Sequence, residues 1–124
     1  MSLLLDTHAF IWWVMGEPME PAAMGQIADP GMLVAVSAAS IWEIGIKRAI
    51  GKLRFDGSMA AEICQGGFEP LAVSCEHAER AGGLPQHHRD PFDRMLIAQA
   101  LGEELTIVTR DDIFAAYGVE LLRC

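Results

Sequence analysis

Four carboxylates in this chain lie at or near the ends of expected strands and the starts of expected helices. Asp6, Asp93 and Asp111 each fall at a strand end or a helix start, and Glu43 lies within the first two turns of the helix after Ser37. In a parallel sheet the carboxyl ends of the strands meet at one edge, and open α/β sheets bind their ligands there. Carboxylates gathered at such an edge repel one another and raise each other's pKa unless a cation lies between them. The set therefore predicts a divalent metal site.

The expected ligands are oxygen atoms, and no histidine or cysteine stands at a spacing typical of metal ligands. Oxygen ligands favour Mg²⁺ or Mn²⁺ over zinc, and Mg²⁺ keeps several waters that can be oriented on a phosphate. Such an ion suits phosphodiester hydrolysis, because it activates water and stabilises oxyanions. The acids thus indicate a metal-dependent hydrolase.

Asp6 and Glu43 also have purely structural interpretations. Asp6, or Thr7 after it, could cap the following helix by accepting hydrogen bonds from its first N–H groups. Glu43 could form an exposed surface pair with Lys47 one turn later, which would contribute about 0.3 to 0.5 kcal/mol. For either residue alone, the sequence leaves both interpretations open.

The segment from His87 to Asp93 combines several polar residues. Asp90 is a natural N-cap before Pro91, and this puts Asp93 at the third helical position, as in a capping box. His87 and His88 could serve as a general acid or as metal ligands, but loop histidines before a helix are usually solvated. We expect the two histidines to be exposed.

Short apolar runs alternate with helical segments along the chain, a pattern typical of an α/β protein with a mostly parallel sheet between helices. Leu3-Leu4-Leu5 has no polar residue, as expected of a central strand covered on both faces. Further strands are expected at residues 32–36, 71–73, 105–108 and 119–122. Helices are expected at residues 9–15, 21–29, 38–50, 58–65, 76–81 and 91–101, and a short one ends at Tyr117.

The composition is that of a small acidic protein. Its 124 residues, of which 52% are hydrophobic, suffice for one domain over residues 1–124 and leave no room for a second. The net charge of −8 would repel a polyanion unless basic groups are clustered or a cation intervenes. All nine basic residues lie at or after Lys47, so any contact with a polyanion is expected in the later part of the chain.

Three cysteines, Cys64, Cys75 and Cys124, are widely spaced and odd in number. They lack the spacing of a zinc site and the density of a secreted disulfide scaffold. The amino terminus has no basic residue before its apolar run, and no stretch approaches the ~18 apolar residues of a membrane span. We expect a soluble protein of the reducing cytoplasm.

Four segments occur together in a characteristic order. They are Leu4-Leu5-Asp6-Thr7-His8; Ser37 to Ile44, with Lys47 and Gly51-Lys52-Leu53; Asp90-Pro91-Phe92-Asp93-Arg94, with Leu96 to Ala100; and Thr109-Arg110-Asp111, with Tyr117-Gly118-Val119. Together they resemble the PIN-domain family, and within it the VapC toxins of bacterial type II toxin-antitoxin systems. Each segment is weak by itself, but their joint occurrence over essentially the whole chain is highly specific.

The resemblance implies a Mg²⁺- or Mn²⁺-dependent endoribonuclease that is usually dimeric and is held inactive by a VapB antitoxin. It implies a three-layer α/β/α fold around a five-stranded parallel sheet. Position by position, Asp6 and Asp93 would bind the metal directly, and Asp111 would be a ligand that often acts through water. Glu43 would be a ligand or would position the attacking water.

The resemblance extends to four neighbouring residues. Thr7 and Thr109 would support the acids by hydrogen bonding, and Asp90 and Asp112 are near neighbours that could assist. For the antitoxin we expect an apolar groove that takes an amphipathic segment, with a basic side chain of that segment reaching the acids. Large apolar residues available for this groove are Phe10, Trp12, Trp13, Ile41, Trp42 and Ile46.

Three other functions were weighed against the toxin. A PIN nuclease that processes or degrades RNA without an antitoxin would be expected to carry extra RNA-binding domains, for which this chain has no room. A phosphorylatable receiver domain would need an aspartate after a middle strand and a late lysine, but Ser37 and Ser74 follow those strands and no lysine follows Lys52. A catalytically idle PIN fold used only for binding has no need of all four acids.

Overall fold

All five strands of the sheet run parallel, in the order β3-β2-β1-β4-β5. The computed structural model describes residues 2–124. The strands are β1 (Ser2–Leu5), β2 (Leu33–Ser37), β3 (Glu69–Leu71), β4 (Thr106–Thr109) and β5 (Leu121–Arg123). The helices are α1 (Thr7–Met15), α2 (Pro21–Ala28), α3 (Ala38–Ala49), α4 (Met59–Gln65), α5 (Cys75–Gly83), α6 (Pro91–Glu103) and the 3₁₀ helix η1 (Asp112–Tyr117).

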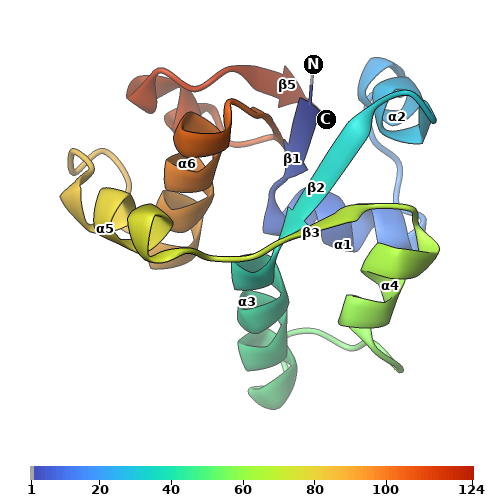
Figure 1. Ribbon diagram of the computed structural model, residues 1–124. Coiled ribbons are helices and arrows are strands. Elements are labelled where there is room, and N and C mark those ends of the chain that lie inside the picture. Colours follow the sequence, from blue (N-terminus) through green and yellow to red (C-terminus); the bar gives the residue numbers. More distant parts are fainter. Residues whose placement is uncertain (1) are drawn as a thin grey trace.

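Helices cover both faces of the sheet, because successive side chains of its central strand point to opposite sides. Leu3 and Leu5 belong to a core with α1, α2 and α4, whereas Leu4 belongs to a second core with α6 and η1. Figure 1 shows α5 and α6 on the left and α1, α2 and α4 on the right. The predicted three-layer α/β/α fold is confirmed.

The register of the sheet aligns the ends of its three central strands. Leu5 lies opposite Val36 of β2 and Val108 of β4. The residues that come next, Asp6, Ser37 and Thr109, therefore lie side by side at the carboxyl ends of the strands, which we call the carboxyl edge of the sheet. All three side chains are buried.

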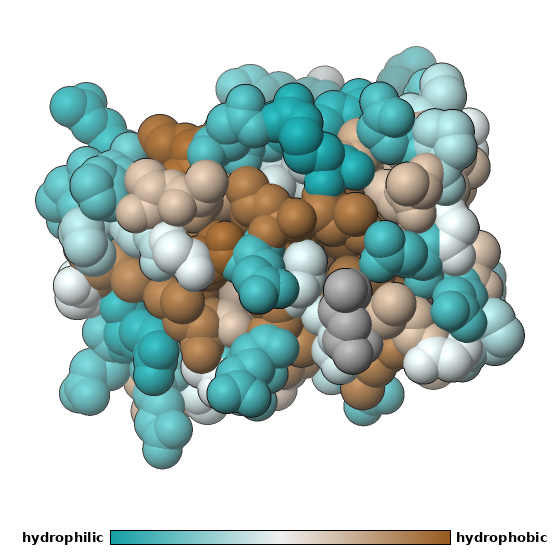
Figure 2. All heavy atoms as spheres, turned by 90° about the horizontal axis from the view of Figure 1, so that it is seen from above, coloured by the Kyte–Doolittle hydropathy of each residue, from teal (hydrophilic) through white to brown (hydrophobic). Residues whose placement is uncertain are grey.

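The other end of these strands is apolar by comparison. Figure 2 views the molecule from above the orientation of Figure 1, from the side on which β1 begins, and shows apolar atoms across the middle of this face with hydrophilic side chains around them. Leu33, the first residue of β2, contributes an exposed apolar side chain. At this end the buried polar residue is Thr106, the first residue of β4, whereas buried carboxylates lie at the carboxyl end.

Two expected elements lie elsewhere in the structure. The third strand was predicted at residues 71–73 but is Glu69–Leu71, an edge strand that contains a proline and has no apolar run to reveal it. The last strand was predicted at 119–122 but is the shorter Leu121–Arg123 at the other edge. Edge strands are weakly patterned, because one side and often one face remain open to solvent.

Helix α5 was predicted as one or two turns over residues 76–81 but spans Cys75–Gly83. A capping box starts it: the His77 N–H donates to the Ser74 hydroxyl, and the Ser74 N–H donates to His77 Nδ1. At its far end, Arg94 donates to the carbonyls of Ala81 and Leu84, which satisfies groups that a helix end leaves free. Both hydrogen bonds come from a residue of α6, so the sequence of α5 does not show them.

The predictions about the cysteines and about membrane spans can also be compared with the structure. Cys64 and Cys75 are exposed and Cys124 is buried, and no disulfide joins them within residues 2–124. Over the same residues, no helix is long and apolar enough to cross a membrane.

Candidate active site

The ends of β1 and β4, the first two turns of α3 and the start of α6 bring the four predicted acids into one region. Asp6 caps α1, where its carboxylate accepts a hydrogen bond of 2.7 Å from the Ala9 N–H. Glu43 lies in α3, Asp93 in the first turn of α6, and Asp111 caps η1. The charges of Glu43 and Asp6 both raise the pKa of Asp93, so the acids interact electrostatically.

Burial makes this region costly for negative charge. Burial, followed by the charges of Asp90, Glu43 and Asp6, raises the pKa of Asp93 to about 7, and the nearby His88 opposes this shift. The pKa of Asp6 is also raised, mainly by burial, although hydrogen bonds from Thr109 and Ala9 oppose the shift. Two carboxyl groups therefore hold protons more tightly than carboxyl groups in water do.

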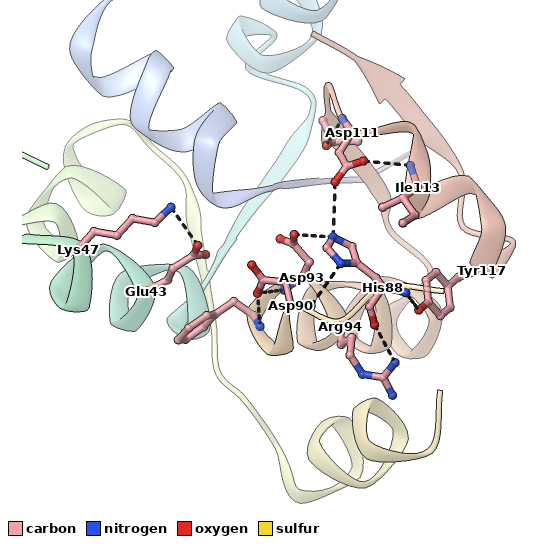
Figure 3. Close-up of polar contacts among 11 residues, drawn as sticks. Glu43, Lys47, His88, Asp90, Asp93, Arg94, Asp111, Ile113 and Tyr117 are labelled. Carbon is pink, nitrogen blue, oxygen red and sulfur yellow. Dashed lines mark hydrogen bonds and ion pairs between the residues drawn. The ribbon is translucent and has the colours of Figure 1, made fainter. Parts of the chain in front are cut away.

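His88 lies between two of the acids, and this was not predicted. Its Nε2 is 2.8 Å from Oδ2 of Asp93 and 3.4 Å from Oδ2 of Asp111 (Figure 3). Ligand atoms of these three residues lie within 4.8 Å of one another. The expectation that His88 is solvated was wrong, because only 16% of its side chain is exposed. His87 is exposed as expected and packs its ring against Tyr117.

One carboxylate oxygen of Glu43 forms an ion pair, and the other has no hydrogen-bond partner among residues 2–124. Its Oε2 pairs with Lys47 Nζ at 3.1 Å, the i, i+4 pair that the spacing suggested. The pair is not a surface one, however, because only 8% of the Glu43 side chain is exposed. Its Oε1 is buried and has no hydrogen-bond partner among residues 2–124. A buried acceptor left without a partner is costly, so this atom is available to a ligand.

The two threonines connect the elements that carry the acids. Thr109 receives a hydrogen bond of 3.0 Å from the Asp111 N–H, and its side chain also bonds to Asp6. Thr109 thus joins the end of β4 to the end of β1. Thr7 donates to the Ser40 hydroxyl at 2.9 Å, which ties the start of α1 to the first turn of α3.

The other two predicted aspartates have different surroundings. Asp90 caps α6 by accepting hydrogen bonds from the N–H groups of Phe92, at 2.8 Å, and Asp93, at 3.3 Å. It is beside the acids, since its charge raises the pKa of Asp93. Asp112 pairs with Arg123, and 79% of its side chain is exposed. The structure therefore does not group Asp112 with the acids.

No local sequence pattern identifies His88, because its position depends on contacts from distant residues. Its backbone N–H donates to the Tyr117 hydroxyl at 2.6 Å, and its carbonyl accepts a hydrogen bond from Arg94. These two bonds hold the loop against η1 and α6. Tyr117 and Arg94 are 29 and 6 residues further along the chain, so only the folded structure reveals the arrangement.

These residues fit a divalent metal ion. They offer several carboxylate oxygens, a buried oxygen of Glu43 without a partner, and two carboxyl groups whose pKa is raised, mainly by burial and further by neighbouring acids. A cation bound among them would relieve the repulsion and use the free oxygen. The donor set includes a nitrogen as well as oxygens, which differs from the predicted all-oxygen site.

An apolar groove of about 460 Å³ lies beside the acids, between α3 and α6. It is lined by Ala38, Ala39, Trp42, Val73, Pro91, Phe92 and Met95. Trp42 is 68% exposed and its ring meets that of Phe92 edge to face. Part of a set of six large apolar residues was expected to line such a groove, and Trp42 of that set does so. Phe10 is instead fully buried, and Trp12 and Trp13 pack partly buried against the core.

Comparisons with known proteins agree on the fold. The PIN domain family matches residues 3–120. VapBC2 from Rickettsia felis, solved bound to a DNA fragment from its promoter, is 16% identical with a TM-score of 0.74, and the match covers 100% of this chain and 99% of that one. DNA-bound VapBC from Salmonella typhimurium is 19% identical with a TM-score of 0.69, over 99% and 98% of the chains.

VapBC-5, a toxin-antitoxin system from Mycobacterium tuberculosis, is 22% identical with a TM-score of 0.64, and the match covers 99% of this chain and 98% of that one. No curated protein matches the chain by sequence. At these identities the structural matches show a shared fold.

Proposed function

The chain belongs to the PIN-domain family, whose members are generally nucleases, and we propose that it is a metal-dependent endoribonuclease acting as the toxin of a VapBC-type pair. Its substrate would be RNA, its inhibitor a VapB-type antitoxin protein, and its place of action the cytoplasm. The structural neighbours that are toxin-antitoxin complexes support this proposal.

The crowding of buried acidic groups around Asp93, with an unpartnered buried oxygen on Glu43, carries the enzymatic part of the proposal. A carboxyl group at a helix start, where the helix dipole favours negative charge, has its pKa raised to about 7. Structural caps have no need of such crowding by other acids. A cluster of acids this unfavourable without a cation supports a site that works with one.

The roles proposed for the acids follow from their surroundings. Asp6 and Asp93, whose pKa values are raised, would hold Mg²⁺ or Mn²⁺ directly. Asp111, with 47% of its side chain exposed, would act through water or at the open side of the site. The ion supplies water activation and stabilisation of charge on the phosphate oxygens.

Glu43 is proposed to position the attacking water. Lys47 fixes its Oε2, and this leaves Oε1 free to accept a hydrogen bond from a water. Thr109 would fix the position of Asp6 relative to the backbone of Asp111 through its hydrogen bonds to both. Thr7, through Ser40, would keep α3 and its Glu43 next to β1. Asp90 would assist by capping α6.

The apolar groove supports the proposed antitoxin partner. A groove lined almost entirely by apolar side chains suits the apolar face of an amphipathic segment. Phe92 in its wall directly precedes Asp93, so a basic side chain of that segment could reach the acids. The net charge of −8 would speed encounter with a basic partner.

Purified protein with Asp93→Asn tests the enzymatic proposal. We expect the wild type to cleave RNA with Mg²⁺ or Mn²⁺ and to stop when EDTA is added, and we expect the variant to lose at least about a hundredfold in rate while keeping its fold. Asp112→Asn is the matched control, because that carboxylate pairs with Arg123 away from the acids. Cleavage by Asp93→Asn at the rate of the wild type would refute the proposed site.

Coexpression with the product of the adjacent small gene tests the partner. The expected result is a complex that purifies together, with cleavage inhibited and growth restored. Trp42→Ser should weaken the complex more than it slows cleavage, since its side chain lines the groove. Sedimentation of the toxin alone and of the complex would test the expected homodimer and hetero-oligomer. Failure both to rescue growth and to form a complex would contradict the antitoxin.

A further inference from the structure

His88 brings a nitrogen donor into a group of carboxylates. Its Nε2 is buried and makes no well-aligned hydrogen bond within residues 2–124, although it lies 2.8 Å from Asp93 and 3.4 Å from Asp111. Figure 3 shows the ring pointing between the two carboxylates. A buried ring nitrogen close to two acids, without a good hydrogen bond to either, is aimed at a position that a cation can share.

The ring is placed there by the backbone around it. The Tyr117 hydroxyl and the Arg94 guanidinium hold the N–H and the carbonyl of His88, and neither bond involves the imidazole. The ring packs edge to face against Phe114, with centroids 6.0 Å apart. The imidazole takes no part in the two backbone bonds, and its own hydrogen bond within the loop, which Nδ1 accepts from the Asp90 N–H, is long at 3.3 Å.

We propose that Nε2 of His88 is a metal ligand together with Asp93 and Asp111, and that this nitrogen makes the site prefer Mn²⁺ over Mg²⁺. The inference rests on the proposed metal-dependent function. Mg²⁺ takes oxygen ligands and waters almost exclusively, whereas first-row transition ions accept imidazole nitrogen. In a site with one histidine and several carboxylates, the histidine therefore determines the difference in affinity between the two ions.

The contacts of both ring nitrogens must change for this ligand to form. The Asp90 N–H donates to Nδ1 of His88 across 3.3 Å, so the ring proton of the metal-free, neutral form is on Nε2. For Nε2 to bind an ion, this proton would have to leave Nε2. The ion would then replace the 2.8 Å contact between Nε2 and Asp93 as well as the long bond from Asp90.

Electron spin echo envelope modulation spectroscopy of bound Mn²⁺ tests the ligand directly, because it detects hyperfine coupling to a coordinated imidazole nitrogen. We expect this coupling in the wild-type protein and its loss in His88→Phe, whose ring can pack against Phe114 without a nitrogen donor. His87→Phe is the matched control: it neighbours the site, is exposed, and should keep the coupling. His88→Asn is a second, smaller variant in case the phenyl ring disturbs the loop, and circular dichroism checks the fold.

Titration calorimetry on the same proteins measures selectivity. In both His88 variants, Mn²⁺ affinity should fall about tenfold or more, the scale at which residues around metal sites act, while Mg²⁺ affinity changes little. Nitrogen coupling absent from the wild type would overturn the inference. Tighter binding of both ions by the variants would also overturn it, since His88 would then compete with the ion.

The two proposals can fail separately. Mn²⁺ that binds without nitrogen coupling, in a protein that still cleaves RNA, removes only the role of His88. A wild-type protein that binds neither ion and cleaves no RNA removes the proposed function itself.

Discussion

The middle and the carboxyl end of the same strands are equally buried but energetically opposite. Leu3, Leu4 and Leu5 are fully buried among apolar side chains, and burial of such groups stabilises the fold. One residue later, Asp6 is just as inaccessible, and burial raises its pKa. Burial that stabilises the strand interior therefore destabilises the charged form of the acid next to it.

The contrast shows where in this fold the energetically unfavourable polar groups lie. The strand interior has no polar side chain to satisfy, whereas the carboxyl edge contains a free oxygen on Glu43 and a raised pKa on Asp93. Such groups persist where the surrounding structure is stable enough to hold them, and they concentrate at functional sites. Substitutions in the two regions should therefore change stability in opposite directions.

Leu4→Ala should give the largest effect. Leu4 is fully buried in the core formed with α6, and its loss should lower the free energy of unfolding by about 2 to 5 kcal/mol. Urea unfolding followed by circular dichroism measures the change. A loss well below 1 kcal/mol would show that the strand interior is not the stabilising region, and the contrast with the carboxyl edge would not hold.

The pH dependence of the metal-free protein tests the carboxyl edge. The folded state holds protons on Asp93 and Asp6 that the unfolded state has already released, because both pKa values are raised. The stability that these groups contribute is therefore lost as pH rises from about 4 to about 7, by on the order of 3 kcal/mol. Urea unfolding in EDTA across this range measures it. Stability that rises steadily with pH would contradict the raised pKa values.

Asp93→Asn should remove most of that dependence. Near pH 7 and without metal, the variant should be more stable than the wild type by about 1 to 2 kcal/mol, less than the full shift implies, because the buried amide also needs hydrogen-bond partners. Its unfolding curves should also vary less with pH. A destabilised variant would indicate that the carboxylate is a structural group.

Asp112→Asn should give the smallest effect. Its pair with Arg123 is exposed, so its removal should change the free energy of unfolding by less than about 0.5 kcal/mol, at any pH and with or without metal. The same unfolding experiment measures it. A change as large as that of Asp93→Asn would mean that total charge, not the position of the acids, governs stability.

The strands and helices could be predicted where local pattern determines them. The all-apolar Leu3-Leu4-Leu5 indicated a central parallel strand, and Asp90 before Pro91 indicated the start of α6. The weakly patterned edge strands and the end of α5 were misplaced. Their bounds depend on sheet pairing and on the Arg94 hydrogen bonds, neither of which the local sequence contains.

The candidate site was predicted only in part, for the same reason. Asp6, Asp93 and Asp111 follow strands or start helices, and Glu43 lies in the second turn of α3, so sheet topology brought them together as the sequence suggested. The place of His88 and the burial of the Glu43–Lys47 pair depend on how loops and helices pack. These tertiary features leave no periodic signal in the sequence.

A comparison of melting temperatures with EDTA and with millimolar Mg²⁺ or Mn²⁺ tests the central claim most directly. Without metal, Asp93→Asn should melt above the wild type, because it removes a buried charge from the group of acids. With metal the order should reverse, because the ion stabilises the wild type by mass action and the variant much less. The same midpoints in EDTA and in metal, for both proteins, would show that the acids do not bind a cation and would contradict the account.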